Sequence, residues 1–95
     1  MDWDDLRYVL AIARQGNLSR AASCLGVTRT TVGRRLRAIE SGLGVRLFDR
    51  TPEGFSPTAA GQDMCEVADE MEADVLSLEG RVLGRDVQLG GKLRV

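Results

Sequence analysis

Residues 18–43 constrain the fold of this 95-residue chain more than any other segment, because they predict two helices joined by a very short turn. The apolar side of the first helix consists of Ala21, Ala22 and Leu25. We expect Ser19 to cap this helix, Gly26 to end it in a left-handed conformation, and Thr28 to cap the next helix. Two helices joined by so short a glycine-containing turn cross steeply, as in a helix-turn-helix.

The second helix is apolar on one face and rich in arginine on the other. Its apolar residues recur at intervals of four, three and four, as one stripe of a helical period: Val32, Leu36, Ile39 and Leu43. Thr30, Arg34 and Arg37 point away from this stripe. Such a helix packs on a small core with one side and enters a DNA groove with the other.

The N-terminal part of this helix supplies the candidates for contact with bases or phosphates, because recognition helices contact bases mainly with their first residues. These candidates are Arg29, Thr30, Thr31 and Arg34. The planar guanidinium of arginine can engage guanine O6 and N7, or a phosphate, with two hydrogen bonds. An ordinary amphipathic helix with a solvated basic face is the alternative, and the two caps and the glycine turn argue against it.

The charge of the chain is unevenly distributed, although its net value is only −1. Residues 1–58 carry nine arginines against six acidic residues, a net +3, and residues 59–95 carry four basic against eight acidic residues, a net −4. The window 28–50 has six arginines against two acidic residues, a net +4. The local field favours a DNA-binding surface over the predicted helix-turn-helix.

Several classes of protein are poorly supported by the sequence. There is no histidine, and Cys24 and Cys65 do not have a metal-ligand spacing, so we expect neither a metal nor a cofactor. We expect no enzyme, because no nucleophile–base pair, phosphate loop or carboxylate pair stands out. No apolar run approaches a membrane span and no signal-peptide pattern is present, so we expect a cytoplasmic protein without membrane contact. Cys24 is interpreted as a small core thiol.

The flanking segments predict a scaffold helix and a wing. Trp3–Gln15 is expected to form a first helix, ended by Gly16, that supports the arginine-rich second helix of the helix-turn-helix. Pro52 and Gly54 bracket a tight turn between two short apolar-containing segments, which predicts a β-hairpin. Arg50 in this hairpin is expected either to contact DNA at the backbone or minor groove, or to pair locally with Asp49 or Glu53.

A long helix is expected from residue 59 to about Leu83, with Thr58 as its cap. Its apolar residues form a heptad stripe that we interpret as a dimerisation seam: Met64, Ala68, Met71, Val75, Leu78 and Val82. Cys65, Val67 and Leu76 lie off the seam and are expected to pack back onto the first helix. The alternative is a helix that packs only within its own domain.

Residues 84–95 are expected to contain a glycine-rich hinge, followed by the start of a strand with no partner in this chain. The sequence therefore predicts three parts. Residues 1–58 form the winged helix-turn-helix domain, 59–83 form the linker or dimerisation helix, and 84–95 form the hinge and the start of a further domain.

With these residues in place, the chain resembles the N-terminal DNA-binding region of LysR-type transcriptional regulators along essentially its whole length. The segments that carry the resemblance are Leu6-Arg7-Tyr8, Gly16-Asn17-Leu18-Ser19-Arg20-Ala21-Ala22, Leu25-Gly26-Val27-Thr28, Ile39-Glu40, Leu43-Gly44-Val45-Arg46-Leu47-Phe48-Asp49-Arg50 and Thr58-Ala59-Ala60-Gly61. The resemblance implies a mainly α fold with three helices, a hairpin wing and a linker helix that pairs antiparallel with that of a second copy. It also implies a parent that is often a tetramer, and a small-molecule inducer bound by a domain outside this chain.

The resemblance also extends the candidate DNA-binding set, to Thr28, Arg29, Thr30, Thr31, Arg34, Arg37 and Arg50. The family commonly has Ser-Gln-Pro where Thr28-Arg29-Thr30 stands, and Arg29 in place of glutamine favours guanine over adenine. Gly33 replaces a common serine and removes one polar contact. Glu53 stands where the wing often carries a basic residue, which argues against a DNA contact there.

The function predicted from the sequence is sequence-specific binding of double-stranded DNA by a bacterial regulator of this type. The recognition helix, residues 28–42, is expected to lie in the major groove of an inverted-repeat site that a homodimer binds. The alternative is a protein–protein interaction module with a helix-turn-helix scaffold and a coiled-coil helix. It predicts no salt-dependent DNA binding, and the basic window at 28–50 argues against it.

Overall fold

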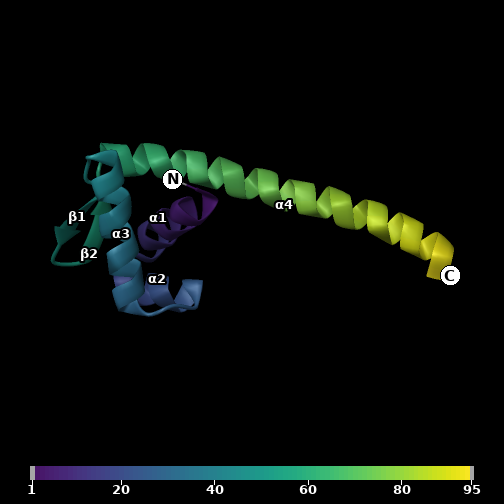
Figure 1. Cartoon of the computed structure of the whole chain (residues 1–95), viewed down its shortest axis with the longest axis horizontal. Coiled ribbons are helices and arrows are strands. Elements are labelled where there is room, and N and C mark those ends of the chain that lie inside the picture. The colour runs from purple at the N-terminus through teal and green to yellow at the C-terminus, as the bar shows by residue number, and fades with distance from the viewer. Residues whose placement is uncertain (1, 95) are drawn as a thin grey trace.

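The computed structural model describes the backbone of residues 2–94 and the side chains of residues 2–84. The elements in chain order are α1 (Trp3–Gln15), α2 (Leu18–Leu25), α3 (Arg29–Leu43), β1 (Phe48–Thr51), β2 (Gly54–Pro57) and α4 (Ala59–Arg94). Three helices and a hairpin gather at one end of the molecule, and α4 projects from them (Figure 1). The predicted fold, a winged helix-turn-helix followed by a long helix, is confirmed.

The turns around α2 follow the expected chemistry with one exception. Gly16 and Gly26 end α1 and α2 in left-handed conformations, with φ of 78° and 72°. The residue that caps α2 is Asn17, whose side chain accepts the Arg20 N–H at 2.7 Å, so the prediction of Ser19 as the cap was wrong. The backbone is extended only at Asn17, directly after Gly16, and α2 therefore starts two residues earlier than a Ser19 cap allows.

α3 is held between a threonine cap and a glycine cap. The Thr28 hydroxyl accepts the Thr31 N–H at 3.2 Å, and Gly44 ends the helix with φ of 72°. The inner face of α3 is buried as predicted through Val32, Leu36 and Ile39. Leu43, expected on the same stripe, is 42% exposed, because the last turn of α3 extends beyond the packed core.

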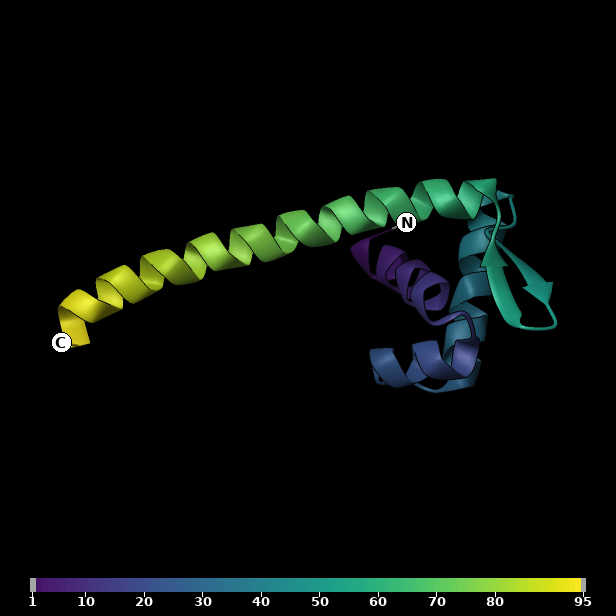
Figure 2. The same cartoon turned by 180° about the vertical axis from the view of Figure 1, so that it is seen from behind.

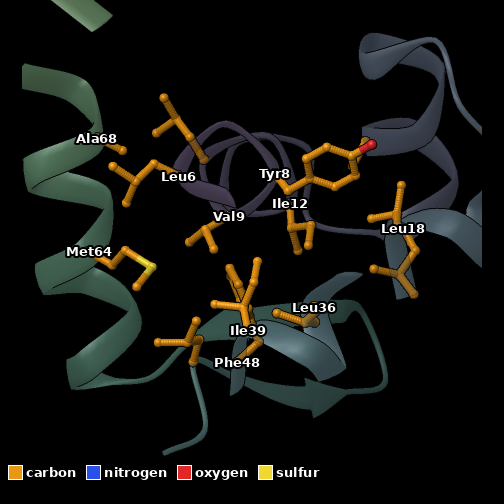
Figure 3. Close-up of a cluster of buried hydrophobic side chains, with 14 of the residues drawn as sticks. Leu6, Tyr8, Val9, Ile12, Leu18, Leu36, Ile39, Phe48, Met64 and Ala68 are labelled. Atoms are coloured by element: carbon orange, nitrogen blue, oxygen red, sulfur yellow. The ribbon is translucent and has the colours of Figure 1, made fainter. Parts of the chain in front are cut away.

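The hydrophobic core lies where α1, α2, α3, the start of the wing and the first turns of α4 meet (Figure 3). The largest side chains within it that are fully buried are Ile12, Leu47, Val9 and Val32. Cys24 does not belong to this core. Its thiol is exposed, because the buried face of α2 is formed by Leu18, Ala21 and Ala22 and Cys24 lies to the side of that face.

The wing is an antiparallel hairpin in which Arg50 pairs with Phe55 and Thr51 with Gly54, with the tight turn where the sequence predicts it. The Phe55 N–H donates to the Gly16 carbonyl at 2.8 Å, which joins the wing to the turn between α1 and α2. Gly54 has φ of 137°, and a Cβ there would collide with the Gly16 carbonyl. The wing is thereby fixed to the domain.

α4 begins as predicted, because the Thr58 hydroxyl accepts the Gly61 N–H at 3.1 Å. The helix does not end near Leu83 but continues to Arg94, so the expected hinge and strand are not formed over residues 84–94. No proline follows Pro57, and a glycine inside a helix costs only about 1 kcal/mol relative to alanine, which does not by itself stop a helix. Val95, the end of the expected strand, lies outside the described residues.

The predicted heptad stripe of α4 divides between two environments. Met64 and Ala68 are buried in the domain core at 9% and 0% exposure, because this side of α4 packs on α1, so they are unavailable as a dimer seam. Val67 and Leu76, expected to pack back onto α1, are instead 50% and 61% exposed. From Val75 onward the seam residues Val75, Leu78 and Val82 are exposed.

None of the helices in the described part of the chain has the length and apolar character needed to cross a membrane. Figure 2, which views the molecule from behind, shows α4 leaving the domain as one continuous helix.

The contact between α4 and the wing predicts a stability difference between two glycine substitutions. A Cβ at Gly61 would collide with the Leu47 carbonyl, whereas a Cβ at Gly42 meets nothing within 4 Å. We expect Gly61→Ala to lower the free energy of unfolding by about 1–3 kcal/mol, and Gly42→Ala to raise it by about 0.5–1 kcal/mol. Urea denaturation followed by circular dichroism measures both, and equal effects would contradict this packing.

Candidate nucleic-acid interface

The outward face of α3 displays Arg29, Thr30, Arg34 and Arg37, all of them exposed. Among the side chains of residues 2–84, none of these three arginines forms an ion pair. The opposite face of α3 is fixed in the core, so the arginines project from a helix that cannot rotate about its axis. A rigid row of unneutralised guanidinium groups is suited to a polyanion such as DNA.

Thr28 and Thr31 take a different role from the residues beside them. Their hydroxyl oxygens lie 2.9 Å apart, and the Thr28 oxygen also accepts the Thr31 N–H. Thr31 is partly buried. Both hydroxyls are therefore engaged first in starting α3, although a hydroxyl keeps some capacity for a further hydrogen bond.

Arg35 is the arginine of α3 that is turned inward. Its Nε donates to Asp5 at 2.7 Å and its Nη2 to Asp4 at 3.2 Å, and its guanidinium lies 4.8 Å from the centroid of the Tyr8 ring. The hydrogen bond from Arg35 holds the pKa of Asp5 below its ordinary value, and Asp5 raises the pKa of Arg35. Arg35 thus joins α3 to α1 and contributes little charge to the outer face.

A groove of about 200 Å³ lies between α3 and the wing, and three arginines line it: Arg37, Arg46 and Arg50. The Arg50 guanidinium lies 5.3 Å from the centroid of the Phe55 ring, a cation–π contact across the hairpin. Within the described side chains Arg50 pairs with neither Asp49 nor Glu53; Asp49 instead lies 3.8 Å from Arg46. The alternative of a local ion pair for Arg50 was therefore wrong.

Glu40 and Arg46 are two groove residues that belong to segments carrying the family resemblance but that the sequence did not predict as site residues. The Glu40 carboxylate accepts the backbone N–H groups of Leu47 at 2.7 Å and Phe48 at 3.4 Å. Glu40 therefore holds the wing at a fixed distance from α3, and its charge is directed at backbone donors. The hydrogen bonds of Glu40 form across the Gly44 turn and follow no sequence pattern, so the spacing of residues predicts neither the role of Glu40 nor the place of Arg46 in the groove.

Comparison with known proteins places this geometry in a family. The family model described as bacterial regulatory helix-turn-helix protein, lysR family, matches residues 3–62. The chain is 41% identical over 68 residues to the HTH-type transcriptional regulator ClcR of Pseudomonas putida, covering 72% of this chain and 23% of ClcR. It is 40% identical over 81 residues to the Mau operon transcriptional activator of Paracoccus denitrificans, covering 83% and 29%. The chain spans about a quarter of the length of these relatives.

Solved structures show the same architecture. The crystal structure of the CbnR_DBD–DNA complex matches with a TM-score of 0.71 and 34% identity, over 95% of this chain and 99% of the CbnR chain. Full-length LysG from Corynebacterium glutamicum matches with a TM-score of 0.84 and 25% identity, over 93% of this chain and 30% of LysG. These proteins share the domain and the long helix that follows it.

The Asp5–Arg35 contact predicts a pH dependence of stability. Because the pKa of Asp5 is lowered in the folded state, the folded protein binds fewer protons than the unfolded chain at acidic pH. The stabilisation is present above about pH 4 and is lost as the pH falls through the folded pKa. We expect Asp5→Asn to lose about 1 kcal/mol at neutral pH and to show a shallower decline below pH 4.

Urea denaturation between pH 2.5 and pH 7 measures this dependence. Asp63→Asn is the charge-matched control, because Asp63 is exposed and makes no ion pair among the described side chains. An identical pH profile for wild type and Asp5→Asn would contradict the assigned contact.

Proposed function

Because this chain belongs to the LysR family of bacterial regulatory helix-turn-helix proteins and carries its DNA-binding domain, we propose that α3 reads the major groove of a specific site. The observation that carries the proposal is the outward face of α3, where Arg29, Thr30, Arg34 and Arg37 are exposed above a buried inner face. The match to the CbnR_DBD–DNA complex supports it.

The positions of the arginines assign them different roles. Arg34 lies at the middle of the outward face and Arg29 in the first turn of α3. The guanidinium groups of both are therefore assigned to base edges, with guanine as the preferred partner. Arg37 and Arg50 line the groove beside the wing and are assigned to phosphates, a role that Arg46 shares. Thr30 at the start of α3 is assigned to the flanking DNA backbone, as are Thr28 and Thr31, whose hydroxyls also start the helix.

Two copies of the chain are proposed to bind an inverted repeat, joined through α4. The exposed part of the seam carries this proposal: Val75, Leu78 and Val82, with Leu83 beside them. Leu78, Val82 and Leu83 lie close together on this stretch of α4, with Glu79 beside them. A lone helix gains nothing from so regular an exposed stripe, whereas a paired helix buries it. A tetrameric parent and an inducer-binding domain remain predictions from the family resemblance.

Arg34→Ala tests the assignment of the reading helix. Losing a two-hydrogen-bond contact to a base costs about 1–3 kcal/mol, so we expect affinity for the preferred duplex to fall by about 5- to 150-fold and base preference to relax at one position. Fluorescence anisotropy with duplexes tiled across the DNA upstream of the gene, over a salt series, measures this. Arg7→Ala, which removes an arginine that pairs with Asp4 on α1, is the control with the same change in charge.

The same titration separates the proposed function from its alternative. Binding to one tile that Arg34→Ala weakens and Arg7→Ala leaves intact supports the reading helix. Equal loss in both variants would show that charge alone is involved. The absence of any binding at low salt would favour the protein–protein interaction module instead.

The dimer seam predicts a second effect. Leu78 is 55% exposed on the seam and Ser77 is exposed beside it, so Leu78→Glu and Ser77→Glu add the same charge at neighbouring positions. We expect Leu78→Glu to raise the dimer dissociation constant at least tenfold, since it places a charge in an apolar interface, and Ser77→Glu to change it less than threefold. Sedimentation velocity over a concentration series measures both constants. An equal effect would place the interface elsewhere.

A further inference from the structure

We propose that Arg14 is a positioning residue: it fixes the direction in which α4 leaves the domain, and through that direction the spacing between the two half-sites that a dimer can bind. The inference rests on the proposed function for its consequence on DNA. Its structural part, the direction of α4, is measurable without DNA.

Arg14 is located in the last turn of α1 and reaches two carboxylates of α4. Its Nη2 donates to Asp69 at 2.7 Å and to Glu72 at 2.8 Å, and its Nη1 donates to the second Glu72 oxygen at 3.3 Å. The planar fork is thus held by three hydrogen bonds to acceptors almost one helical turn apart. A fork bound in this way fixes direction as well as distance.

The contact lies at the point where α4 departs from the domain. Met64 and Ala68 are buried in the core, and within residues 59–84 of α4 the last partly buried ones are Met71 and Glu72. Every side chain from residue 73 to residue 84 is exposed. Among the hydrogen bonds of the described residues, those of Arg14 are the ones that connect α1 to the body of α4.

The apolar contacts alone define this direction poorly. Among proteins, crossing angles scatter by about 15–20° around the values that ridges-into-grooves packing prefers, so the type of packing does not by itself specify one angle. Met64, Ala68 and the partly buried Met71 form the apolar contact of α4 with the domain, and two of these three side chains are flexible methionines. The Arg14 guanidinium adds a directional attachment over the same stretch, at Asp69 and Glu72, so the direction of α4 does not depend on flexible side chains alone.

The exposed length of α4 amplifies small changes in angle. Gly84 is twelve residues beyond Glu72, which is about 18 Å along a helix, so a tilt of about 10° moves it by about 3 Å. That displacement is close to the rise of one base pair, about 3.4 Å. If the direction of α4 varies by this amount, a dimer joined through α4 no longer specifies a single spacing between half-sites.

The exposure of the three side chains indicates that this contact matters little for global stability. The side chains of Arg14, Asp69 and Glu72 are 48%, 58% and 37% exposed, and such pairs contribute modestly to the free energy of unfolding. Arg14 lowers the pKa of Glu72, so the pair is fully charged at neutral pH. The effect of its loss is therefore expected in geometry, with the fold retained.

Distance measurements between spin labels test the direction of α4. Labels are placed at Ser41→Cys on α3 and Gly84→Cys on α4, both exposed, in a Cys24→Ser, Cys65→Ala background diluted with unlabelled chain. We expect a narrow distance distribution for the parent and for Arg7→Gln, and a distribution broadened or shifted by about 3 Å for Arg14→Gln. The exchanged pair Arg14→Glu, Glu72→Arg should restore the narrow distribution. An unchanged distribution in Arg14→Gln would overturn the inference.

The consequence for DNA is tested with duplexes that carry one half-site, or two half-sites whose spacing changes one base pair at a time. We expect Arg14→Gln to bind a single half-site like wild type, while its preference for the best spacing falls about two- to fivefold. If Arg14→Gln keeps the wild-type preference for one half-site spacing, the proposed link between the Arg14 contact and the DNA site is overturned. A wild type without a preferred half-site overturns the proposed function instead, and the label distances still decide the direction of α4.

Discussion

The burial of the inner face of α3 is the constraint on which the rest of the structure depends. Val32 is fully buried, and it shares the core with Val9 and Ile12 of α1. Because side chains follow each other at fixed angles around a helix, fixing one face also fixes the other. A rotation of α3 by one residue would carry an arginine into the core, at a cost far above any gain outside it. The outward arginines are therefore placed by the packing beneath them.

The wing and α4 take their positions from α3 through a short chain of backbone contacts. Glu40 near the end of α3 accepts the Leu47 N–H, and the Leu47 carbonyl accepts the Thr58 N–H at 2.9 Å. Thr58 in turn starts α4, where Gly61 allows the helix to approach the Leu47 carbonyl. The backbone of Leu47 thus joins α3, the wing and α4, while its side chain is buried in the hydrophobic core.

The elements and most of their ends were predictable from the sequence, because they depend on local chemistry. Gly16, Gly26 and Thr28 act where their backbone preferences place them. Apart from the cap of α2 and the end of α4, the errors concern which face of a helix meets a partner. Met64 and Ala68 continue a regular heptad, and only the position of α1 shows that they are covered within the domain. The exposure of Cys24 and the contacts of Glu40 and Arg14 likewise depend on tertiary packing, for which the sequence carries no periodic signal.

The ion pairs in the structure explain how a chain with nearly balanced charge can carry a basic surface. Asp4 and Asp5 neutralise Arg35, and Asp69 and Glu72 neutralise Arg14. These acidic residues therefore pair with arginines that join one helix to another. The arginines on the outward face of α3 are not neutralised by an ion pair among the described side chains. A net charge of −1 is compatible with a strongly basic reading face for this reason. The same division separates the arginines that we propose contact DNA from those that join one helix to another.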